Sequence, residues 1–196
     1  MNNKAFWSGV CLFLFLTSTG CAPEPLPGEL APFVPQQDEG DDGETFEQQG
    51  FKITPLATYD IEARVLSIKS YNDSEQDNLA PLDFALGWGE MSDPLVYEEL
   101  DIRQGHRWYN YSWGSKGPPI PLSSIIKQSA NVHLIPKNDE IKDQLFDVNE
   151  GEVIRLKGRL VAVQQGHFHW RSSLSRKDSG NGACELMYVE EIKRLY

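Results

Sequence analysis

The sequence contains little cysteine and lacks an apolar run long enough to form a transmembrane helix. Its three cysteines are Cys11, Cys21 and Cys184. The longest apolar stretch covers residues 5–16, about a dozen residues, whereas a helix that spans a bilayer needs roughly twenty. This stretch is therefore excluded as a transmembrane anchor.

Positive charge is also scarce, and the chain has a formal net charge of -11. Residues 24–49 hold eight acidic side chains and no Lys or Arg, whereas residues 50–196 carry 21 acidic and 17 basic side chains. Binding to a phosphate backbone depends on clustered Lys and Arg. A nucleic-acid partner is therefore not expected.

Motifs with a defined chemistry are missing as well. The sequence has no phosphate-binding glycine loop, no zinc motif of accepted spacing, no nucleotide fingerprint and no clear Ser-His-Asp pattern. No cofactor is expected, and a binding protein is favoured over an enzyme.

The N-terminus has the layout of a signal peptide. Lys4 precedes the apolar run, which is followed by the small residues 17–20 and then by Cys21. This order of a positive charge, an apolar segment and a small-residue cleavage site is typical of exported precursors. We predict that residues 1–20 are removed.

The segment Ser18-Thr19-Gly20-Cys21 resembles the lipobox of bacterial lipoproteins. The resemblance implies that a lipid on Cys21 anchors the mature protein to a membrane. Ser18 stands where that motif usually has Leu, so ordinary cleavage without a lipid is the alternative. Ala22 resembles the residue that follows the cysteine in lipoproteins of the outer membrane, which implies a periplasm-facing location if the host is Gram-negative.

Residues 21–50 are predicted to form a lipidated cysteine followed by a disordered linker. Five prolines lie between Pro23 and Pro35, and residues 36–49 are mostly acidic, Gln or Gly. So few apolar side chains cannot offset the entropy of ordering the chain. Residues 51–196 then form a single domain, which is long enough to bury a core.

The pattern of residues 51–196 predicts a mainly β domain. Strands are expected at 57–71, 83–88, 106–113, 131–135, 152–163, 167–174 and 184–192. Two short helices are expected, one near 123–129 and one that begins after Asn138. In the first strand the apolar positions switch phase after Val65, which indicates a β-bulge.

This order of elements suggests a small barrel. A bulged strand, further strands, a helix and then a long strand with the central glycine Gly158 match an OB-like barrel of five strands. An unrelated curved β-sheet is the alternative.

Several sequence blocks resemble a family of exported bacterial proteins of unknown function. The blocks are LDFALGWGEMSD (82–93), RWYNYSW (107–113), PIPLSSI (119–125), SANVHLIP (129–136) and WRSSLSRKDSGNGACEL (170–186). They cover most of the predicted domain. The resemblance implies kinship but no activity, cofactor or partner.

Cys184 is the candidate nucleophile, because it is the only thiol left after removal of Cys11 and acylation of Cys21. A thiolate formed beside His133 or His169 could attack an acyl group. The segment SGNGACEL resembles that of L,D-transpeptidases, but Ala183 and Glu185 depart from their pattern. The alternative is that Cys184 packs as a small buried side chain.

Two further patterns could form binding sites. His167 and His169 share one face of a strand with Arg171 and could bind zinc or copper with a third ligand from His106, His133 or a carboxylate. The alternative is a solvated surface strand.

The strand expected at 152–163 places Arg155, Lys157 and Arg159 on one face. Together with Arg171 these side chains could form a cationic surface. An ordinary strand face paired with acidic side chains is the alternative.

Trp108 and Trp113 lie on a strand rich in aromatic residues, which forms either core or a stacking platform.

Together these patterns favour a lipid-anchored accessory module that binds a protein or glycan of the cell envelope. Its candidate binding residues share positive charge or an indole ring. They are Arg155, Lys157, Arg159, Arg171, Trp108 and Trp113. A cysteine-dependent envelope hydrolase or transferase and a metal-binding protein are the alternatives.

Overall fold

The computed structural model describes residues 31–40, 43–175 and 183–196. The predicted signal peptide and Cys21 lie outside these ranges. The strands are β1 (Gln36–Asp38), β2 (Phe46–Gln48), β3 (Phe51–Ser70), β4 (Leu82–Gly87), β5 (Leu100–Gly105), β6 (Trp108–Trp113), β7 (Ser129–Pro136), β8 (Val153–Gln165), β9 (Phe168–Arg171) and β10 (Glu185–Arg194). The helices are α1 (Glu75–Leu79), the 3-10 turn η1 (Gly89–Ser92), α2 (Pro94–Tyr97), α3 (Leu122–Lys127) and α4 (Asp139–Phe146).

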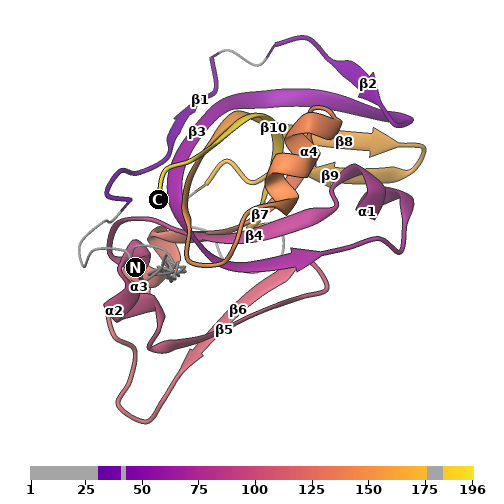
Figure 1. Ribbon diagram of the computed structural model, residues 1–196. Coiled ribbons are helices and arrows are strands. Elements are labelled where there is room, and N and C mark those ends of the chain that lie inside the picture. The colour runs from indigo at the N-terminus through magenta and orange to yellow at the C-terminus, as the bar shows by residue number, and fades with distance from the viewer. Residues whose placement is uncertain (1–30, 41–42, 176–182) are drawn as a thin grey trace, which may run out of the picture.

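Five strands close into a barrel, as Figure 1 shows. Their order around the ring is β3, β4, β7, β10 and β8, and β8 pairs again with β3. The β7–β10 pairing is parallel and the other four are antiparallel. Because α4 connects the third barrel strand to the fourth, this is the topology of an OB-fold. The predicted fold class is confirmed.

The barrel interior holds the main apolar core. Each of the five strands contributes alternate residues, among them Tyr59, Phe84, Val132, Leu156 and Met187, which are all fully or almost fully buried. Helix α4 closes one end of this core with Ile141, Leu145 and the following Val148.

The cap of α4 explains where this helix begins. The Asn138 side chain accepts a hydrogen bond from the Ile141 amide at 2.9 Å, which satisfies one of the free amides of the first turn. Both predicted helices are present. The structure adds α1 and α2, which are too short to produce an apolar periodicity in the sequence.

Two bulges bend the long strand β3 around the barrel. The predicted bulge is confirmed by a register shift between Val65 and Ser67. A second shift lies between Pro55 and Ala57. Between the start of β3 and this second bulge, the apolar side chains point to the outer face of the sheet. Phe51 and Ile53 pack there in a separate cluster.

Gly158 permits a close approach between the neighbouring strands β8 and β10. A Cβ at this position would lie 1.9 Å from the Tyr188 carbonyl oxygen, far inside van der Waals contact. The central glycine that suggested a barrel is therefore required by backbone packing.

The prediction of a disordered linker is wrong for the described part of residues 31–50. Strands β1 and β2 pair with β3, and the turn from β2 into β3 places Gln49 and Gly50 at positive φ. The Phe46 ring lies 4.9 Å from the Tyr188 ring. Composition failed here because two short strands gain hydrogen bonds along the exposed edge of β3 while burying few apolar side chains.

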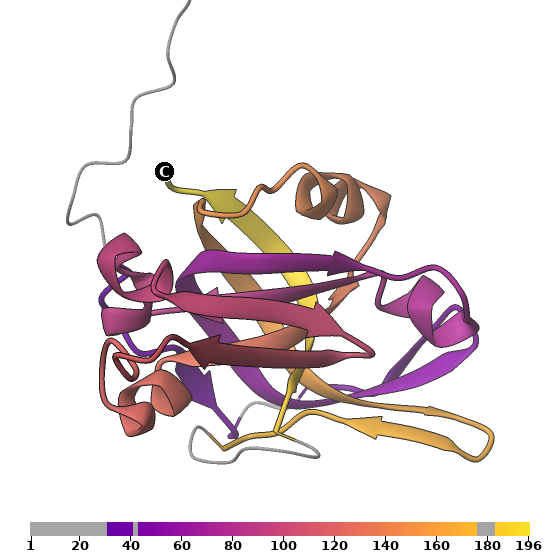
Figure 2. The same cartoon turned by 90° about the horizontal axis from the view of Figure 1, so that it is seen from below.

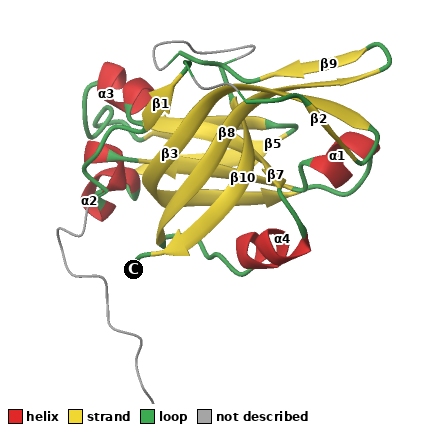
Figure 3. Cartoon of the chain, turned by 90° about the horizontal axis from the view of Figure 1, so that it is seen from above, coloured by secondary structure: helices red, strands yellow, loops and turns green. Residues whose placement is uncertain are grey.

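The remaining elements are the hairpin β5–β6, the short helices and β9, which lie around the barrel. The hairpin β5–β6 forms its own two-stranded sheet between β4 and β7 in the chain. Figures 2 and 3 show α2 and α3 together at one end of the barrel, and α1 and β9 at the other end. Among the described residues, no helix is long and apolar enough to cross a membrane.

Candidate functional site

The candidate site lies on the outer face of the second and third barrel strands, β4 and β7. In an OB-fold this face, with the loops between strands one and two and between strands four and five, is the usual place for a ligand. Here those loops carry α1 and β9. The hairpin β5–β6 folds back over the same face, because Gln104 Nε2 donates to Asn131 Oδ1 at 2.7 Å.

Alternation along β4 and β7 places a buried carboxylate beside a buried imidazole. Leu82 and Phe84 face the core, so Asp83 faces outward, and His133 lies opposite it on β7. His133 Nδ1 lies 2.9 Å from Asp83 Oδ1, and the side chains are 3% and 1% exposed. The second oxygen, Asp83 Oδ2, is buried without a hydrogen-bond partner among the described residues.

Arg107 neutralises this carboxylate from the tip of the β5–β6 hairpin. Its Nη1 lies 2.6 Å from Asp83 Oδ1, and its Nη2 lies 2.5 Å from Asp77 Oδ1 in α1. Nη2 also donates to the Ala80 carbonyl at 2.8 Å. One guanidinium therefore ties the hairpin, α1 and β4 together.

The turn that presents Arg107 is strained. His106 and Arg107 have φ values of 52° and 67°, in the left-handed region that side chains with a Cβ rarely adopt. The two-residue turn of a tight hairpin requires positive φ at both central positions. A strained arginine held by two carboxylates is typical of a functional site.

Aromatic rings surround the guanidinium. The Arg107 Cζ lies 3.8 Å from the centre of the Tyr71 ring and 5.5 Å from that of Trp170. The His133 and Trp170 rings lie 4.8 Å apart. Arg107 and Trp170 are thus neighbours, each partly exposed, above the buried Asp83–His133 pair.

A pocket of 460 Å³ opens beside these two side chains. Its walls come from α1, the hairpin tip and β9. They comprise Gln76, Asp77, Arg107, Phe168, His169 and Trp170. We call this cavity the Trp170 pocket.

The ionisation of the nearby groups follows from these contacts. Burial would raise the pKa of Asp77, but hydrogen bonds from Arg107 and Ser74 outweigh it and lower that pKa. Burial and the nearby Asp83 raise the pKa of Tyr71. Arg107 and Asp77 thus face the pocket as an ion pair beside the Trp170 indole, whereas Asp83 is buried and does not line the pocket.

The predicted cationic row lies elsewhere, on the outer face of β8. Arg155 donates to both oxygens of Asp60 at 2.8 and 2.7 Å, and Lys157 Nζ lies 3.7 Å from the same carboxylate. Arg159 Nε lies 3.4 Å from Glu190 Oε1. The Arg155 guanidinium lowers the pKa of Asp60. All three cationic side chains of the row therefore pair with acidic side chains, as on an ordinary strand face.

Arg171 does not join this row. It lies opposite Ala162 in the β8–β9 pairing, whereas Arg155, Lys157 and Arg159 occupy the odd-numbered positions of β8. Directly opposed residues share a face and successive residues alternate. The register therefore places Arg171 on the opposite face of the sheet.

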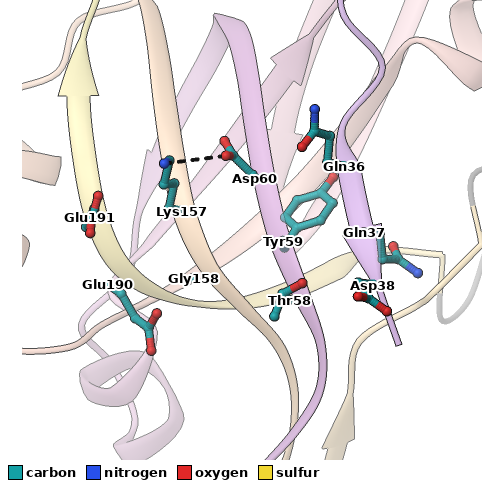
Figure 4. Close-up of a pocket in the computed structure, with 10 residues that line it drawn as sticks. All are labelled: Gln36, Gln37, Asp38, Thr58, Tyr59, Asp60, Lys157, Gly158, Glu190 and Glu191. Carbon is teal, nitrogen blue, oxygen red and sulfur yellow. Dashed lines mark ion pairs between the residues drawn. The ribbon is translucent and has the colours of Figure 1, made fainter. Parts of the chain in front are cut away.

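A wide groove of 660 Å³ runs beside the row, between β1, β3, β8 and β10. Figure 4 shows Lys157 on β8 paired with Asp60 on the adjacent strand β3, with Glu190 and Glu191 of β10 on one side of this pair and residues of β1 on the other. Its charged lining consists of Lys157 and the acidic side chains Asp38, Asp60, Glu190 and Glu191. Its aromatic residue, Tyr59, is 2% exposed and packs in the barrel core, whereas Trp170 is partly exposed to its pocket.

The two candidate tryptophans lie on opposite faces of β6. Trp113 stacks on Tyr111 with ring centres 6.4 Å apart, and Tyr109 and Tyr111 pack against a small apolar cluster. The aromatic face is thus mostly packing. Trp108 lies on the other face and is exposed; neither indole lines the Trp170 pocket.

Cys184 lies next to the site, where its thiol is half-buried. Its Sγ lies 3.9 Å from Asn131 Nδ2 and 3.9 Å from the Arg107 carbonyl oxygen. His133 directs Nδ1 to Asp83, and His169 is exposed on β9. This geometry favours packing over nucleophilic chemistry.

The metal hypothesis gains no support from the described residues. His169 lines the Trp170 pocket, and His167 lies in the exposed turn before β9. Within residues 31–40, 43–175 and 183–196, no group of three or more His, Cys, Asp or Glu is placed to hold a metal ion.

Sequence reasoning missed the residues that shape the pocket. Asp77, Asp83 and Arg107 come from three segments, and nothing in their spacing indicates that they meet. Trp170 alternates with His169 along β9 and so lies on the opposite face of that strand. The unusual His106-Arg107 turn, without glycine or asparagine, was the only available signal.

We also compared the chain with known proteins. It matches no protein-family model, no curated protein and no solved structure.

Proposed function

We propose that this protein is a lipid-anchored binding module of the bacterial cell envelope, and that the Trp170 pocket binds an uncharged saccharide of an envelope glycan. The observation that carries the proposal is the pairing of Trp170 with Arg107 on the usual ligand face of the fold. The proposed anchor is a lipid on Cys21.

The chemistry of the pocket supports a sugar. An indole offers an apolar surface to the C–H face of a pyranose ring. Arg107, Asp77 and Gln76 place fixed donors and acceptors around it, and a few well-placed polar groups give such pockets their specificity. A bound sugar would find these groups already oriented, because Arg107 is held by Asp77, Asp83 and Ala80.

Charge supports an uncharged ligand over an anionic one. Arg107, the guanidinium that lines the pocket, is already paired with Asp77 and Asp83. An anionic sugar or a nucleic acid would therefore meet an ion pair instead of a cluster of free cations.

The proposal is tested by titration calorimetry on the mature chain, residues 22–196. The ligands are oligomers of N-acetylglucosamine and of glucose, with oligogalacturonate as the anionic comparison. We expect binding of an uncharged oligomer, at least ten-fold weaker binding of oligogalacturonate, and loss of binding in Trp170→Ala.

Two further variants separate a binding defect from a folding defect. His169→Ala changes an exposed pocket residue and should weaken binding without altering the thermal midpoint. Trp113→Ala removes an indole outside the pocket and should leave binding unchanged. Absence of saccharide binding, or binding that Trp170→Ala leaves intact, would refute the proposal.

A further inference from the structure

The described chain begins at a fixed point on the barrel. Ala31 is buried, its amide donates to Ser92 Oγ at 2.9 Å, and its carbonyl accepts from the Gly89 amide at 2.8 Å. Both partners belong to η1. The chain is therefore held at η1 from Ala31 onward.

This attachment limits the distance between the domain and a lipid on Cys21. Only residues 22–30 lie between Cys21 and Ala31, and nine residues span at most about 30 Å in any conformation. A compact domain of this size is about 40 Å across. A linker shorter than the domain cannot hold it far from the bilayer, in contrast to the longer spacer expected from the sequence.

Exposed apolar side chains gather around this attachment point. Five of the large apolar residues that remain exposed in the described chain lie on segments that meet at η1, α2 and α3. They are Phe33, Val34, Leu95, Trp113 and Leu122. We call this surface the apolar end.

Contacts between these segments place the five residues on one end of the barrel. Phe33 and Val34 follow Ala31 and Pro32 in the chain and lie beside Asp60, Glu62 and Arg155. Helices α2 and α3 both contact η1. Trp113 lies opposite Leu100, the residue that begins β5 shortly after α2. Leu95 is 80% exposed on α2, so it is available to a surface outside the protein.

We infer that the apolar end lies against the bilayer that holds the lipid of Cys21, and that the Trp170 pocket faces away from it. The inference rests on the proposed lipid anchor. Figures 2 and 3 place α1 and β9, which line the pocket, at the opposite end of the barrel from α2 and α3. Exposed apolar and aromatic side chains are suited to the membrane interface.

Charge indicates which contact dominates. The segments of the apolar end carry four acidic side chains, Glu90, Asp93, Glu98 and Glu99, and two basic ones, Lys116 and Lys127. Attraction to anionic headgroups is therefore not the cause of this orientation. The short linker and the exposed apolar side chains cause it.

The test uses the mature, acylated protein in vesicles of phosphatidylcholine with brominated acyl chains, which quench nearby indoles. Acylation is checked first by mass spectrometry, and vesicle binding by flotation. We expect quenching of the wild type that falls by at least half in Trp113→Phe and is unchanged in Trp170→Phe.

Two apolar-to-acidic variants serve as a matched pair. Leu95→Glu should abolish the quenching, whereas Phe146→Glu, on the exposed side of α4, should leave it unchanged. Both positions are exposed, so neither change should alter the thermal midpoint.

The outcomes separate the two claims. An acylated, vesicle-bound protein that shows no quenching, or that loses quenching with Trp170→Phe, overturns the orientation and leaves the anchor intact. A mature protein without lipid on Cys21 overturns the anchor and the orientation with it.

Discussion

Removal of the Arg107 charge should strongly destabilise the fold. Arg107→Met keeps an apolar stem but removes the guanidinium from Asp77 and Asp83, so that Asp83 retains only His133 beside it; these carboxylates are 15% and 1% exposed. Breaking a buried ion pair by removing one member costs about 3–5 kcal/mol, because the remaining charge is uncompensated. For a chain of this length the thermal midpoint should fall by roughly 6–20 °C.

The pH dependence should distinguish this charge effect from lost packing. In the wild type the pKa of Asp77 is lowered, since the Arg107 hydrogen bond outweighs burial. Its contribution to stability is therefore present above the unfolded pKa, about 4, and is lost as pH falls through the lower folded value. The difference between wild type and Arg107→Met should be largest near pH 7 and shrink below about pH 4.

Urea denaturation at pH 7 and at about pH 3, below the unfolded pKa of Asp77, measures both effects. Arg103→Met is the matched control, because its pair with Asp101 is exposed, with side chains 77% and 52% accessible; such pairs contribute about 0–1 kcal/mol. Adding Asp83→Asn to Arg107→Met should cost at least about 1 kcal/mol less than the sum of the single changes. The reasoning is refuted if Arg107→Met is no more harmful than Arg103→Met, or if the two changes are additive.

Three further changes test the local geometry. Gly158→Ala should lower the free energy of unfolding by about 3 kcal/mol or more, because its Cβ would lie 1.9 Å from the Tyr188 oxygen. Gly105→Ala, whose Cβ would have no atom within 4 Å, should change the free energy of unfolding by less than about 1 kcal/mol. A similar loss in both variants would contradict the packing argument. Asn138→Ala should cost about 1 kcal/mol in urea denaturation through loss of the α4 cap, and Asn138→Ser should recover most of it. His106→Gly should raise the thermal midpoint by a few degrees, since it relieves a φ of 52°; a lower midpoint would show that the turn is not strained.

The sequence predicted the fold better than it predicted the site. The barrel followed from local signals: the phase switch after Val65, the helix after Asn138 and the central Gly158. These features act through neighbouring residues or backbone packing, and they remain visible in a linear pattern. The same patterns identified Arg155, Lys157 and Arg159 as a row on one strand face.

The rest depended on long-range register. Arg107 and Asp83 are 24 residues apart and meet only because the β5–β6 hairpin folds back over β4. Arg171 is separated from the cationic row by a register that no local pattern fixes. The strands before Phe51 were missed because their stability comes from hydrogen bonds to β3, to which composition is insensitive.

The most direct test of the central claim is an NMR titration of the mature chain with the saccharide oligomer that binds most tightly. The account predicts that the largest shifts occur at the indole N–H of Trp170, the side-chain N–H of Arg107 and the amides of residues 76, 77, 168 and 169. It predicts smaller shifts around Lys157 and Asp60 in the groove of Figure 4. Shifts centred on that groove, or no shifts at millimolar ligand, would contradict the assignment of the Trp170 pocket as a saccharide site.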